Sequence, residues 1–182
     1  MHKKLTSKEL VDIDALVYRN GLPPYAQELF RRLIPILKRL DPNQLSESSF
    51  IAVEEQRKES ILVLKVDPSD ENIPFLVLRA YPDHCYLGLA DSEYLEAHRI
   101  PSDWQELVNQ VISETEKYLS GVTIVERYNH KNKLIGKTYF YGIDSENDKS
   151  LAIGNSSFLF FPRKVASIVK RTHRFFKEEP SI

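Results

Sequence analysis

The strongest chemical pattern in the sequence is a basic segment near the C-terminal end of the chain. Between residues 163 and 177 there are six basic side chains and no acidic one. These are Arg163, Lys164, Lys170, Arg171, Arg174 and Lys177. Such a cluster is typical of a surface that contacts phosphate groups or acidic side chains. The six are therefore candidate partner-binding residues, although a surface helix with basic residues suited to its own C-terminal dipole is a simpler interpretation.

A second chemical candidate is Cys85, the one cysteine of the chain, which directly follows His84. A cysteine and a histidine form a nucleophile and its base when their side chains meet. Adjacent residues of a strand point to opposite faces, so Cys85 would need His98, His130 or His173 instead. We therefore expect Cys85 to be a small buried apolar residue, and we assign no catalytic residue.

A third candidate is the alternation of Asp144, Glu146 and Asp148, which resembles the ligand spacing of a calcium loop. That pattern also needs Gly at position six and Glu at position twelve, where this chain has Lys149 and Asn155. No His or Cys spacing is typical of a zinc site, and no glycine-rich phosphate loop follows a predicted strand. The sequence predicts no metal and no cofactor.

The composition is that of an ordinary globular protein. The chain has 182 residues, 42% of them hydrophobic and 28% charged, with a net charge of −1. This length favours a single domain over residues 1–182, large enough to fold without a disulfide or metal. A lone cysteine, no signal-peptide pattern and no apolar run long enough to cross a bilayer predict a cytoplasmic protein with no transmembrane segment.

Apolar periodicity predicts four amphipathic helices, at about residues 7–19, 24–40, 102–120 and 163–177. An interior proline, Pro35, predicts a kink near residues 31–34 or two helices meeting there. Trp104 begins the apolar stripe of the helix at 102–120, which should cover a sheet. A further helical turn is expected to begin at residues 91–94 and to end before Pro101.

The stretch from Ile61 to Ala90 should form the middle of a sheet. Two of its apolar runs, 61–64 and 75–78, are continuous, which is typical of strands covered on both faces. Their short connections favour an antiparallel meander. Further strands are expected from Ser49, at 122–128, at 134–143 and at 157–161.

The predicted fold is therefore α+β: two N-terminal helices, a mostly antiparallel sheet of about six or seven strands, one inserted helix and a basic C-terminal helix. By analogy of element order alone, this arrangement suggests immunity proteins of bacterial toxin systems or secretion chaperones. Our first hypothesis is a non-catalytic protein-binding module with a partner that is another protein, acidic in character. A homo-oligomer is left open.

Two alternatives belong to other classes. The first is a small-molecule enzyme or ligand-binding domain with a pocket between the sheet and helix 102–120. The second is nucleic-acid or membrane-surface contact through the basic C-terminal helix.

Overall fold

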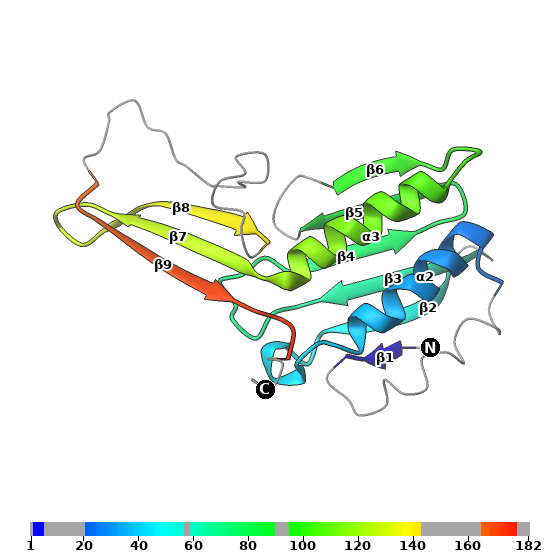
Figure 1. Ribbon diagram of the computed structural model, residues 1–182, viewed down its shortest axis with the longest axis horizontal. Helices are drawn as coiled ribbons and strands as arrows, with labels where there is room; N and C mark the ends of the chain where they lie inside the picture. Colours follow the sequence, from blue (N-terminus) through cyan, green and yellow to red (C-terminus); the bar gives the residue numbers. More distant parts are fainter. Residues whose placement is uncertain (1, 6–20, 57–58, 90–94, 143–164, 178–182) are drawn as a thin grey trace, which may run out of the picture. The chain divides into compact units, whose positions relative to one another are not determined.

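The computed structural model describes residues 2–5, 21–56, 59–89, 95–142 and 165–177 (Figure 1). By chain contacts it divides into two compact units. Unit 1 comprises residues 1–116 and 175–182, and unit 2 comprises residues 117–174. The predicted helix at 7–19 and the predicted strand at 157–161 lie outside the described residues. The single domain expected from the chain length stays a prediction.

The α+β class with antiparallel pairing is confirmed, but the expectation of one sheet is wrong. The described strands form two sheets, one of six strands in the order β1-β2-β3-β4-β5-β6 and one of three in the order β8-β7-β9. The first contains the predicted antiparallel meander together with two strands that were not predicted, β1 and β6. Its strands are β1 (His2–Lys4), β2 (Phe50–Gln56), β3 (Glu59–Val66), β4 (Leu76–Ala80), β5 (His84–Leu89) and β6 (Leu95–Arg99).

The centre of unit 1 is β3, which is buried on both faces as the continuous apolar run predicts. Ile61, Leu62, Val63 and Leu64 are all at most 5% exposed although they alternate between the faces. Leu64 lies opposite Ile51 in β2 and Leu78 in β4, so these three side chains form one row across the sheet. All three are fully buried.

Two helices cover one face of the six-stranded sheet (Figure 1). Helix α2 runs from Pro24 to Leu37 and buries Tyr25, Ala26, Leu29, Phe30, Leu33, Ile34, Ile36 and Leu37. It begins at a proline, which suits a first helical turn. It is one helix through Pro35, so the alternative of two helices meeting there is wrong. Helix α3 runs from Gln105 to Ser120 and matches the predicted inserted helix.

In unit 2 the predicted basic C-terminal helix is wrong, and this is the largest difference from the predicted fold. Residues expected to form the basic helix 163–177 form instead a strand, β9 (Ser167–His173), beside β7 (Val122–Tyr128) and β8 (Leu134–Tyr141). Pairing with β7 runs from Val122 opposite His173 to Tyr128 opposite Ser167. Ile168, Val169 and Thr172 are β-branched, which favours a strand when a pairing partner is present. Of the predicted buried face, Val165, Ile168 and Val169 are exposed.

A second correction concerns residues 95–99. The helical turn expected before Pro101 is replaced here by β6, which pairs with β5 from His84 opposite Arg99 to Gly88 opposite Leu95. Sheet pairing overrides the local preference of Leu95, Glu96 and Ala97 for a helix.

The burial of aromatic side chains gives a stability prediction. Phe30 of α2 is fully buried, whereas Trp104, just before α3, is partly exposed. We expect Phe30→Ala to lower the free energy of unfolding by about 3–5 kcal/mol and Trp104→Ala to cost less, since solvent already reaches part of the indole. Urea denaturation of both variants measures the difference. A larger loss for Trp104→Ala would contradict this order.

Candidate functional site

The basic residues predicted to bind a partner lie on a strand and the segment after it. Lys170 and Arg171 belong to β9, Arg174 follows it, and all three are exposed. Lys177 lies in unit 1, where its backbone N–H donates to the carbonyl of Arg39 at 3.1 Å. Arg163 and Lys164 lie outside the described residues. The structure therefore places three of the six candidates together, along and just beyond an exposed strand.

Strand β9 is also the main site of exposed apolar side chains in the described part of the chain. In the described part of the chain, four large hydrophobic residues are exposed: Leu134 (43%), Val165 (46%), Ile168 (56%) and Val169 (47%). Three of the four lie in β9 or just before it. Ile168 and Val169 are adjacent on the strand and so point to opposite faces. β9 thus exposes apolar surface on both sides.

Glu126 of β7, the strand next to β9, contacts basic residues of both neighbouring strands. Its carboxylate is only 13% exposed and accepts a hydrogen bond from the Tyr128 hydroxyl at 2.9 Å. It also lies 3.4 Å from the Arg171 guanidinium and 3.9 Å from the Lys137 ammonium group. The hydrogen bond to Glu126 raises the pKa of Tyr128. The Glu126 carboxylate thus faces two cations, one on β9 and one on β8.

The candidate Cys85 is unsuited to catalysis. It is fully buried, and burial raises the pKa of its thiol to about 12, which removes the reactive thiolate at neutral pH. The neighbouring His84 is partly exposed, contacts the Asp83 carboxylate and stacks on Tyr81 with ring centroids 4.4 Å apart. Of the three histidines considered as a base for Cys85, His98 is the one whose backbone lies opposite it, across the pairing of β5 with β6.

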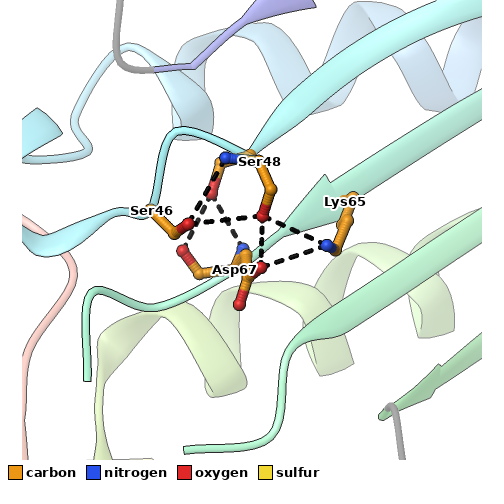
Figure 2. Close-up of polar contacts among 5 residues, drawn as sticks. Ser46, Ser48, Lys65 and Asp67 are labelled. Carbon is orange, nitrogen blue, oxygen red and sulfur yellow. Dashed lines mark hydrogen bonds and ion pairs between the residues drawn. The ribbon is translucent and has the colours of Figure 1, made fainter. Parts of the chain in front are cut away.

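A polar cluster that the sequence analysis missed joins the chain before β2 to the end of β3 (Figure 2). The Asp67 carboxylate accepts a hydrogen bond from the Ser48 hydroxyl and forms an ion pair with Lys65 at 3.0 Å. Lys65 also donates to the Ser48 hydroxyl at 3.1 Å. Only a structure reveals this cluster, because Ser48 and Asp67 are 19 positions apart in the sequence and are brought together by the pairing of β2 with β3.

The contacts of Lys65 link it to both segments. Its ammonium group lies 3.0 Å from the Asp67 carboxylate and 4.4 Å from the centre of the Phe75 ring. Beside it, the buried Ser49 hydroxyl donates to the Asp67 carbonyl at 2.8 Å and accepts from the Asp67 N–H at 2.9 Å. The cluster therefore fastens the two segments together.

A second missed feature is an open surface depression of about 330 Å³ between α2 and α3, which we call the arginine groove. Its lining residues are Arg31, Arg32, Pro35, Ile36, Arg39, Ile112 and Glu116. Every one of them belongs to unit 1. The signal in the sequence was the spacing of four between Arg31, Pro35 and Arg39, which places them on one side of a helix.

Among the described residues, no group of three or more His, Cys, Asp or Glu side chains gathers as a metal site would require. Asp144, Glu146 and Asp148 lie outside this part of the chain. No described helix is both long enough and apolar enough to cross a membrane.

Comparisons of the chain with protein-family models, curated proteins and solved structures gave no match.

The polar cluster can be tested through its buried member. Ser49→Ala removes both hydrogen bonds to the Asp67 backbone inside the protein, so we expect a loss of about 1–3 kcal/mol in unfolding free energy. Ser48→Ala is the matched control, because water can replace that exposed hydroxyl; its effect should stay within about 0.5 kcal/mol. Urea denaturation compares the two, and equal losses would contradict the assignment.

Cys85 gives a pH prediction. With a thiol pKa of about 12 in the folded protein, iodoacetamide at about pH 8 should alkylate Cys85 very slowly. In urea the thiol returns to a pKa of about 8.5 and should react readily. Mass spectrometry of both reactions measures the contrast. Rapid alkylation of the folded protein would restore Cys85 as a candidate nucleophile.

Proposed function

We propose that this chain is a non-catalytic protein-binding module that takes an extended, acidic segment of another protein along strand β9. The single observation that carries the proposal is the combination, on one strand, of exposed apolar and exposed basic side chains. Ile168 is 56% exposed and Val169 47%, and Lys170 and Arg171 follow them directly.

The position of β9 in its sheet favours strand addition. In the described part of unit 2 it is the end strand of the order β8-β7-β9, with β7 as its neighbour. The outer edge of such a strand presents backbone N–H and C=O groups that an incoming strand can pair with. Main-chain hydrogen bonds then supply affinity, and alternate side chains supply specificity.

The charge on β9 supports an acidic partner. Arg171 shares the Glu126 carboxylate with Lys137, and Arg174 adds a further exposed cation. Opposite charge on a partner steers association and fixes its register.

Basic residues on an edge strand also have a protective role, since charge there discourages aggregation. Protection alone does not account for Ile168 and Val169, whose exposure favours association. Burying each of them in a complex would contribute about 1.5–3 kcal/mol before entropy is subtracted. The apolar pair therefore favours binding over simple protection.

The finer class, an immunity protein or a secretion chaperone, rests on element order and remains part of the proposal. Both classes act by binding rather than by catalysis. Neither requires a metal or cofactor.

The proposal predicts selective binding of acidic extended peptides. Fluorescence anisotropy would compare labelled peptides that alternate Val with Glu and peptides that alternate Val with Lys. We expect the acidic series to bind, with an affinity that falls as salt rises from about 50 to about 300 mM. Ile168→Asp should weaken binding about tenfold or more, because it removes apolar contact and adds a like charge.

Leu134→Asp is the matched control, since Leu134 is equally an exposed apolar residue but lies on β8, at the other edge of the same sheet. It should leave affinity unchanged. Failure of every acidic peptide to bind, or equal loss in both variants, would overturn the proposal. Binding of duplex DNA that Ile168→Asp leaves intact would favour the nucleic-acid alternative instead. Concentration-dependent dimerisation abolished by Ile168→Asp would identify a second copy as the occupant.

A further inference from the structure

The arginine groove lies in unit 1, where α2 and α3 face each other, and the proposed protein-binding function does not use it. Arg31, Pro35 and Arg39 follow one another at intervals of four along and just beyond α2, with Arg32 and Ile36 beside them. Ile112 and Glu116, also four apart, face them from α3. The volume of about 330 Å³ is at the lower end of the range for small-molecule pockets.

The three arginines of the groove have different partners, and in the described residues only Arg31 forms a salt bridge. The Arg31 guanidinium donates two hydrogen bonds to the Glu28 carboxylate, at 2.8 and 2.6 Å. Arg32 donates instead to the neutral Asn109 side chain at 2.6 Å, and the Arg39 guanidinium lies over the Phe176 ring at 4.3 Å. Among the described residues neither Arg32 nor Arg39 forms a salt bridge, although the charge of Arg32 also helps to lower the pKa of Glu28. Both guanidinium groups can therefore still pair with a ligand.

The remaining lining residues add an apolar surface and a hydrogen-bond acceptor. Ile36 and Ile112 are buried residues whose side chains form part of the groove wall. Pro35 has no N–H, so the carbonyl of Arg31 lacks the donor that a helix normally supplies. Glu116 is the one acidic residue among the seven, against three arginines. The groove is therefore cationic on the α2 side, with apolar surface between the helices.

We infer that the arginine groove binds a small organic phosphate. Guanidinium groups match the oxygens of a phosphoryl group in pairs, and two that lack a carboxylate partner supply the charge. The phosphoryl group lies between Arg32 and Arg39, and the apolar body of the ligand packs against Ile36 and Ile112. This site lies in unit 1 and is proposed separately from the peptide site on β9 of unit 2.

Isothermal titration calorimetry tests the inference with AMP, inorganic pyrophosphate and adenosine as probes. We expect AMP to bind, pyrophosphate to bind more weakly because it lacks an apolar body, and adenosine not to bind at up to about 1 mM. Equal binding of pyrophosphate and AMP would assign the site to inorganic anions and overturn the organic ligand. Adenosine binding as well as AMP, or no binding of any probe, would overturn the phosphate site.

Substitutions locate the binding in the groove. Arg32→Gln and Arg39→Gln should each weaken AMP binding about tenfold or more, since each removes a charged hydrogen-bond donor. Glu116→Gln should hold or strengthen it, because that change removes a like charge. Lys38→Gln is the control: it removes one exposed positive charge beside Arg39 without altering the lining. We expect at most about a threefold change from it.

Thermal unfolding of each variant checks that the fold persists. Arg32→Gln leaves the contact between Arg39 and Phe176 in place, so it is the decisive variant if Arg39→Gln proves unstable. AMP binding that Arg32→Gln and Lys38→Gln weaken equally would indicate a general effect of charge and would overturn the site. Loss of AMP binding with acidic-peptide binding intact would separate this site from β9.

Discussion

The structure of unit 1 depends on the burial of both faces of β3. Ile61 to Leu64 offer no polar side that could face water, so each face of the strand must be covered. One face carries the row formed by Leu64, Ile51 and Leu78, on the strands to either side. The pairing of α2 with α3 over this sheet follows from the same requirement, because each helix has an apolar stripe to bury. The arginine groove is formed between the two helices that this core requires.

Much of unit 1 could be predicted from the sequence because its signals are local and agree with one another. Short apolar runs separated by turn residues indicated the meander, and apolar spacing indicated α2 and α3. β6 was missed because Leu95, Glu96 and Ala97 suit a helix as well as a strand. What decides their conformation is the partner strand β5, which lies outside the local window.

The C-terminal segment shows how a local pattern can mislead. Val165, Ile168, Val169 and Thr172 repeat at helical spacing, yet the same β-branched types favour a strand. Pairing with β7 at seven positions settles the conformation of Ser167–His173. No feature within the segment indicates that β7 lies beside it. The residue types of the candidate site were thus visible in the sequence, whereas their arrangement along an edge strand was not.

The fold shows that the basic side chains of this chain have different electrostatic environments. A net charge of −1 gives no reason to expect a cationic site, but the chain carries 25 basic side chains whose environments differ. Arg31 and Lys65 are matched by carboxylates at 2.6 and 3.0 Å and serve the structure. Arg32 and Arg39 rest on an amide and an aromatic ring, which position a guanidinium without cancelling its charge. The proposed binding cations therefore differ from Arg31 and Lys65 in the neutrality of the group that holds them, which depends on contacts between residues as distant as Arg32 and Asn109.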